Sequence, residues 1–232
     1  MSLTDVECFS SKYNGYDYVD LGLSVKWAAQ NIGAVSFGDF GDVYMWGELN
    51  PKDDEKSKKC LESQEYWDLL TYMVGNDFRN VLPSELKRIQ ELTGCRTYGV
   101  HIENISANHT YDVARANYGG VWRIPTNREW QELIEMCSWK ECIQDDFKGA
   151  KVTSKVNGNT LLLPYSNDGM GLGAAYWSAN SLWKKSSWRY DVWRFHMTYA
   201  LYFDSFDAKN GVIRPCFTWH TKDFALPIRP IF

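Results

Sequence analysis

The densest group of residues suited to binding chemistry lies in residues 180–197, which read NSLWKKSSWRYDVWRFHM. Aromatic rings alternate there with cationic side chains around a single acidic residue, Asp191, so the segment is locally basic in a chain of net charge −4. Tryptophan, tyrosine and arginine are the residues most enriched at binding hot spots, and binding residues concentrate in loops carried by a rigid scaffold. The sequence therefore predicts a ligand-binding segment made of Trp183, Lys184, Lys185, Trp188, Arg189, Tyr190, Trp193, Arg194, Phe195 and His196.

This segment has other interpretations. Trp188 and Trp193 could be core residues of an extra hairpin whose lysine and arginine head groups reach water. Aromatic stacking on bases with cations along phosphates would suit a nucleic acid, but the rest of the chain is acidic, so no nucleic acid is expected. The expected partner is a protein or glycan whose pockets are filled by the rings, while lysine and arginine supply orientation and association rate.

Catalytic and metal-binding signatures are missing from the sequence. There is no HExxH motif, Ser/His/Asp set or paired-carboxylate signature. The glycine-rich residues 165–173 lack the GxxxxGK[ST] pattern of a phosphate loop. No cysteine pair has Cys-x-x-Cys spacing, and the four histidines do not lie near the cysteines at zinc-ligand spacing. The sequence therefore predicts no enzyme activity, no metal and no cofactor, with mostly reduced, buried cysteines.

Length and composition set broad limits. The 232 residues suffice for one large domain with its own core. A core of short strands packed with rings would account for most of the 11 Trp, 14 Tyr and 11 Phe. The chain contains no run of about 18 apolar residues, so no membrane span is predicted. The N-terminus has neither a basic start nor an apolar stretch, so no signal peptide is predicted, and the protein is expected in the cytoplasm or associated with a phage or cell surface.

The binding segment needs a scaffold, and residues 119–133, GGVWRIPTNREWQEL, are its clearest element. Thr126 and Glu129 have the spacing of a capping box. Pro125 favours an extended approach to the helix. Trp130, Leu133 and the following apolar residues recur at helical spacing. The sequence therefore predicts a helix over 126–138 that anchors the fold.

Simpler patterns predict the remaining elements. Alternating or continuous apolar runs favour strands, Asn-Gly between two such runs favours a hairpin, and apolar residues at helical spacing favour helices. Strands are predicted at 18–27, 43–46, 150–156, 160–163, 175–179, 198–203 and 212–217. Residues 1–15 are predicted to be a loose leader, 51–59 a charged loop, 65–74 and 84–92 helices, and 218–232 an extended tail with docked apolar residues.

These motifs and their order resemble the Fibrobacter succinogenes major paralogous domain family, which has a C-type-lectin-like fold. The resemblance rests on residues 119–133 and on 18–27, 44–48, 175–178, 200–205 and 211–215. It implies one α+β domain over 16–232, with a mixed, mostly antiparallel sheet, flanking helices and neighbouring terminal strands. The divergent residues at about 52–108 would be a helical insertion. Loops between the late strands form the ligand face in such folds, and residues 180–197 match that position.

Related proteins with this fold suggest three further functions. Calcium-dependent lectins use Glu-Pro-Asn or Gln-Pro-Asp and Trp-Asn-Asp motifs, which are absent here, so no calcium is predicted. Formylglycine-generating enzymes share a motif like Arg123–Trp130 but use a late cysteine pair, whereas only Cys216 lies late in this chain. Variable proteins of diversity-generating retroelements place a hypervariable patch between motifs that resemble 175–178 and 212–215. Their patches are often rich in Asn, Ser and Tyr, unlike this one, so this function remains the alternative.

Overall fold

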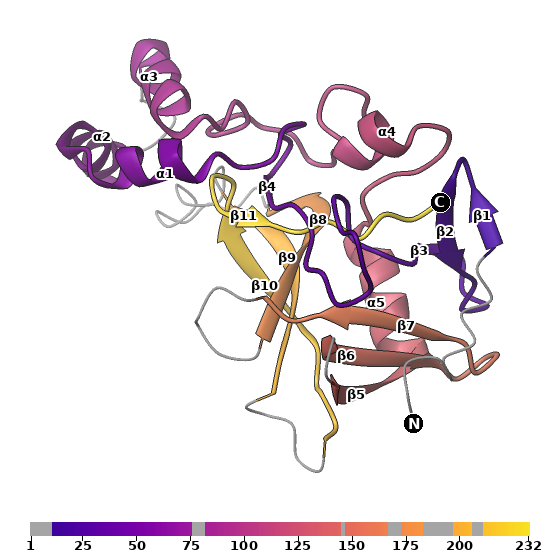
Figure 1. Ribbon diagram of the computed structural model, residues 1–232. Coiled ribbons are helices and arrows are strands. Elements are labelled where there is room, and N and C mark those ends of the chain that lie inside the picture. The colour runs from indigo at the N-terminus through magenta and orange to yellow at the C-terminus, as the bar shows by residue number, and fades with distance from the viewer. Residues whose placement is uncertain (1–10, 76–81, 145–146, 167–172, 183–196, 206–210) are drawn as a thin grey trace, which may run out of the picture.

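The computed structural model describes residues 11–75, 82–144, 147–166, 173–182, 197–205 and 211–232 (Figure 1). These residues form an α+β fold with four small sheets. The described helices are α1 (Asp54–Leu61), α2 (Gln64–Gly75), α3 (Pro83–Thr93), α4 (Val113–Tyr118) and α5 (Asn127–Met136). The described strands are β1 (Ser11–Tyr13), β2 (Tyr16–Val19), β3 (Trp27–Ala28), β4 (Tyr44–Met45), β5 (Cys137–Gln144), β6 (Phe147–Ser154), β7 (Thr160–Pro164), β8 (Gly173–Ser181), β9 (Met197–Asp204), β10 (Cys216–Thr221) and β11 (Ala225–Leu226).

The strands pair differently from the single mixed sheet that the resemblance implies. The sheets have the orders β1-β2-β3, β5-β6-β7, β8-β9-β10 and β4-β11. Each pairing between described strands is antiparallel. Antiparallel neighbours can be joined by short connections, and the predicted Asn157-Gly158 turn joins β6 to β7 in this way.

The two ends of the described chain lie together, as the resemblance implies. Lys26 and Phe232 exchange both backbone hydrogen bonds, at 2.9 and 3.0 Å. Ile231 does the same with Arg123, at 2.9 and 3.0 Å. The ring of Tyr13 stacks on that of Phe232, with 4.4 Å between centroids. The C-terminal residues therefore form a link between β3 and the chain that leads into α5.

The N-terminal predictions need correction at their boundaries. Residues 11–13, assigned to the loose leader, form β1, which pairs with β2. The predicted strand at 18–27 is interrupted, because its middle forms turns between β2 and β3. Leu21 is nevertheless fully buried, and its carbonyl accepts a hydrogen bond from the Ser154 hydroxyl at 2.6 Å. The alternating apolar residues of 18–27 are therefore buried in part, but they do not form one continuous hydrogen-bonded strand.

The predicted anchor helix corresponds to α5, which ends earlier than predicted because Cys137 and Ser138 begin β5. The polar contacts at the start of α5 are tightly connected. One carboxylate oxygen of Glu129 accepts hydrogen bonds from the backbone N–H and the hydroxyl of Thr126, both at 2.6 Å. Arg123 donates to the other oxygen. Burial raises the pKa of Glu129, but these hydrogen bonds outweigh burial and the net pKa is lowered. Glu129 therefore fixes both the helix start and the strand-like chain before it.

Replacement of Glu129 by alanine is expected to lower the free energy of unfolding by about 2 kcal/mol, because the cap and the half-buried Arg123 both lose an acceptor. Glu129→Gln keeps one oxygen acceptor and is expected to cost about half as much. Urea unfolding of both variants would measure the difference. Equal stability of the alanine variant and the wild type would show that this helix start contributes nothing.

Large aromatic side chains fill the centre of the molecule, as the composition predicts. Trp46, Trp130 and Trp177 are fully buried. Their indole N–H groups donate to backbone carbonyls: Trp46 to Ser178 at 2.9 Å, Trp130 to Trp177 at 3.3 Å, and Trp177 to Tyr44 at 2.6 Å. Buried indoles need such acceptors. These bonds hold β4 and α5 against β8.

Helices α1, α2 and α3 gather beside the end of the molecule where β10 turns into β11 (Figure 1). They surround a small core of their own, made of Cys60, Tyr66, Ile89, Cys95 and Tyr98. The predicted helices at 65–74 and 84–92 correspond to α2 and α3. The predicted charged loop is wrong over most of its length, because residues 54–61 form α1.

Candidate functional site

All ten predicted binding residues, Trp183 to His196, lie outside the described residues. The structure does describe the two strand ends that carry this segment. The N–H of Leu182 donates to the carbonyl of Met197 at 3.0 Å, and the Thr198 hydroxyl donates to the carbonyl of Asn180 at 2.8 Å. The segment 183–196 therefore starts and ends at adjacent positions of β8 and β9.

The base of the segment is fastened to other elements. The side-chain oxygen of Asn180 accepts a hydrogen bond from the N–H of Asn127 at 2.8 Å, which satisfies a free donor in the first turn of α5. The N–H of Ser181 donates to the carbonyl of Glu103 at 2.9 Å. The strand end that leads into the segment is thus tied to the anchor helix.

An aromatic surface lies next to this base, on the β9–β10 face, defined here as Met197, Tyr199, Phe217 and Trp219. Met197 is paired with Thr221, and Tyr199 with Trp219, so their side chains share one face of the sheet. Trp219 is 56% exposed. The rings of Tyr199 and Phe217 meet edge to face, with 6.3 Å between centroids. A large exposed ring on a paired strand is a ready contact point for a partner.

Trp219 was not among the predicted site residues, because the sequence placed it in an extended tail. The alternation of Phe217, Trp219 and Thr221 with polar residues was the available signal.

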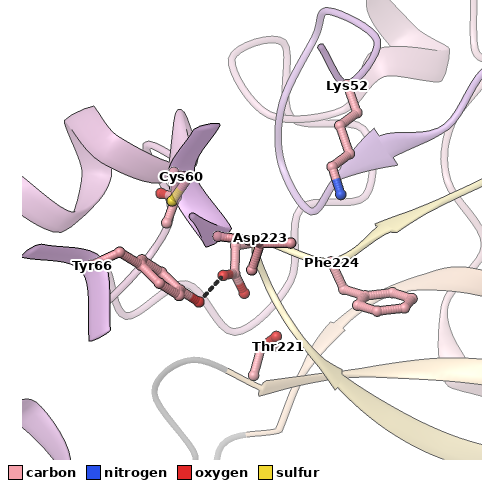
Figure 2. Close-up of a pocket in the computed structure, with 8 residues that line it drawn as sticks. Lys52, Cys60, Tyr66, Thr221, Asp223 and Phe224 are labelled. Carbon is pink, nitrogen blue, oxygen red and sulfur yellow. Dashed lines mark hydrogen bonds between the residues drawn. The ribbon is translucent and has the colours of Figure 1, made fainter. Parts of the chain in front are cut away.

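A pocket of about 210 Å³ opens between the helical part of the molecule, which is the group of helices α1, α2 and α3, and the turn after β10 (Figure 2). Its lining comes from four separate stretches of the chain: Lys52, Cys60, Leu61, Tyr66, Thr93, Thr221, Asp223 and Phe224. Spacing along the chain does not indicate this pocket, because these stretches become neighbours only when the fold forms. Thr221 links the two candidate regions, since its strand partner is Met197, where residues 183–196 end.

Asp223 is the most polar feature of the pocket wall. The hydroxyl of Tyr66 donates to Oδ2 of Asp223 at 3.3 Å. Burial and then the charge of Asp223 raise the pKa of Tyr66, so this hydroxyl keeps its proton and remains a donor. The other oxygen, Oδ1, is buried and has no hydrogen-bond partner among the described residues. The carboxylate thus has an acceptor that the described part of the fold leaves unused.

The described cysteines do not form a reactive pair. Cys60, Cys95, Cys137 and Cys142 are free thiols. Burial raises the pKa of Cys60, Cys95, Cys137 and Cys142, which keeps them as weakly nucleophilic thiols. Cys216 is exposed on β10.

The described residues contain no group of three or more His, Cys, Asp or Glu that could hold a metal ion. None of the described helices has the length and apolar character to cross a membrane.

Comparison of the chain with known proteins identified no similar protein. No protein-family model matches the chain, and searches of curated proteins and of solved structures returned no match.

Proposed function

We propose that the protein is a non-catalytic binding domain with a C-type-lectin-like fold, which recognises a protein or glycan through residues 183–196 and the adjoining β9–β10 face. The observation that carries the proposal is the 56% exposure of Trp219 on a paired strand, beside the base of a segment rich in Trp, Tyr and Arg. Exposed rings of this kind dominate the affinity of many interfaces.

The base of the segment favours binding. Hydrogen bonds at Asn180, Ser181 and Leu182 fix the strand end to α5, to Glu103 and to β9. A fixed base reduces the ordering that a partner must impose, and ordering costs affinity. A strand end fixed by bonds outside the segment also suits the alternative of a retroelement variable protein.

The first test is a glycan array together with affinity capture, using the wild-type protein and a variant with a short Gly/Ser loop in place of residues 183–196. We expect a specific ligand for the wild type and its loss from the loop variant, with the same near-UV circular dichroism. A folded loop variant with an unchanged binding profile would contradict the proposal. A loop variant that does not fold would assign these aromatic residues to the core.

Trp219→Ala is expected to weaken binding of the captured ligand at least tenfold, because truncation of an interface hot spot commonly costs about 2 kcal/mol. Its stability should stay within about 0.5 kcal/mol of the wild type, since the side chain is mostly exposed. Trp67→Ala is the matched control, because Trp67 is 47% exposed on α2, outside the β9–β10 face. Titration calorimetry would compare the two, and equal losses would remove the β9–β10 face from the site.

A further inference from the structure

The pocket between the helical part and the turn after β10 carries one cationic and one anionic side chain. Lys52 comes from the chain between β4 and α1, and Asp223 from the turn between β10 and β11. Figure 2 shows the Lys52 side chain reaching into the open part of the view, while the Asp223 carboxylate points toward the Tyr66 hydroxyl. Lys52 forms no ion pair with a described residue, and the described partner of the Asp223 carboxylate is the neutral Tyr66 hydroxyl. The two charges therefore lie in one pocket without neutralising each other.

The thiol of Cys60 lies in the wall of the same pocket. Burial raises its pKa, the negative charge of Asp223 raises it further, and the positive charges of Lys56 and Lys52 lower it. Cys60 thus experiences the fields of both charged pocket residues.

The remaining lining is apolar at the rim and hydroxylated inside. Leu61 is 55% exposed and Phe224 is 42% exposed, so both can cover an apolar group at the mouth. The ring of His220 stacks on Phe224, with 4.7 Å between centroids, and holds that ring in place. Tyr66 and Thr221 supply hydroxyl groups to the wall. Pockets with an apolar body and a few convergent polar groups are typical of small-molecule sites.

We propose that this pocket binds a free α-amino acid with an apolar side chain. Asp223 would accept hydrogen bonds from the ammonium group, Lys52 would pair with the carboxylate, and the apolar side chain would lie against Leu61 and Phe224. A cavity of about 210 Å³ is larger than the roughly 150 Å³ apolar cavity that accepts benzene, so a small amino acid fits its size. This function is additional to partner binding through the β9–β10 face.

Calorimetric titration of the full chain with L-leucine tests the proposal directly. Two analogues each remove one charge: 4-methylpentanoate lacks the ammonium group, and 3-methylbutylamine lacks the carboxylate. We expect L-leucine to bind at least about tenfold more tightly than either analogue, because each charge-assisted hydrogen bond contributes about one factor of ten. An amine or acid that binds as tightly as L-leucine, or no binding of L-leucine at millimolar concentration, would overturn it.

Variants then assign each charge to a side chain. Asp223→Asn should reduce the affinity for L-leucine to about that for 4-methylpentanoate, while Asn can still accept from Tyr66. Lys52→Met should reduce it to about that for 3-methylbutylamine. Asp68→Asn and Lys59→Met are matched controls on the exposed surfaces of α2 and α1, and both should leave the affinity unchanged. If Asp223→Asn fails to fold, the Lys52→Met comparison alone decides, since unchanged L-leucine affinity there would contradict the assignment.

Discussion

Replacement of Arg229 by methionine is expected to lower the free energy of unfolding by about 4 kcal/mol, which corresponds to a fall in Tm of about 10 °C for a chain of this size. Arg229 is 1% exposed and lies in the C-terminal segment between β11 and the end of the chain. Its position alone would not suggest such an effect, because the sequence predicts only an extended tail there.

The reason lies in the acceptors that the guanidinium satisfies. Nε donates to Oδ1 of Asn31 at 2.8 Å. Nη1 donates to the carbonyls of Ala28 and Ala29, at 3.1 and 2.5 Å, and Nη2 donates to the carbonyl of Leu162 at 2.9 Å. Methionine fills part of the volume but donates nothing. Each buried acceptor left without a donor costs about 1–3 kcal/mol, and the losses are not additive because all four acceptors share one side chain.

These bonds also explain how distant parts of the chain are held together. Ala28 belongs to β3, Leu162 to β7, and Arg229 to the C-terminal segment. Among the described residues no carboxylate pairs with the guanidinium, so its charge is stabilised by carbonyl dipoles. Arginine suits this role because its planar fork presents five donors and stays protonated when buried.

The control is Arg214→Met, because Arg214 is exposed and its loss should change stability by less than about 0.5 kcal/mol. Guanidinium chloride unfolding of both variants measures the difference in the free energy of unfolding. An unchanged slope of this free energy against denaturant concentration would show that unfolding stays cooperative. If Arg229→Met lost less than about 1 kcal/mol, the four acceptors would have to be satisfied in another way.

Much of the fold follows from local patterns in the sequence. Strands β8 and β9 and helix α5 coincide with predicted elements, because their apolar spacing and the Thr126-x-x-Glu129 box act over a few residues. Helix α1 was missed because its charged residues suggested a loop. Those same charges favour a helix: Asp54 and Glu55 lie in its first turn, Lys58 and Lys59 in its last, and Lys59 pairs with Glu55 at 3.1 Å.

The pocket could not be predicted in the same way. Lys52, Tyr66 and Asp223 belong to segments that are far apart in sequence and are brought together by α1, α2 and the β10–β11 turn. Spacing along a chain reveals groups on one helix or strand, but it carries no information on which segments meet in space. For the same reason the burial of Lys222, next to Asp223, is visible only in the structure.

Lys222 gives the second large effect, in the dependence of stability on pH. Its side chain is 1% exposed, and its ammonium lies 4.6 Å from the centre of the Trp46 ring. Nζ donates to the carbonyl of Val100 at 2.8 Å. Burial lowers the pKa of Lys222 from 10.5 to about 8, with a smaller opposing effect of Cys95. One carbonyl and one ring face do not replace the hydration that the ammonium loses.

The sign of the effect follows from the protons bound in each state. Between about pH 8 and pH 10.5 the unfolded chain keeps the proton on Lys222 and the folded chain does not. Stability therefore rises with pH through this window. A pKa difference of this size corresponds to about 3 kcal/mol, at about 1.4 kcal/mol for each pH unit. The stability gained when Lys222 loses its proton is complete above the unfolded pKa of 10.5. It is lost as the pH falls through the folded pKa of about 8.

A comparison with Lys222→Met isolates this effect from other titrating groups. Buried tyrosines and cysteines also titrate in alkaline solution, but they are common to both proteins, so their own contributions cancel in the difference apart from the smaller coupling of Cys95 to Lys222. The stability of the wild type minus that of Lys222→Met should increase by about 3 kcal/mol from about pH 7 to about pH 11. The same difference for Lys59→Met, an exposed lysine on α1, should stay flat. A flat difference for Lys222→Met as well would mean that the ammonium is as well solvated in the fold as in the unfolded chain, which burial against Trp46 argues against.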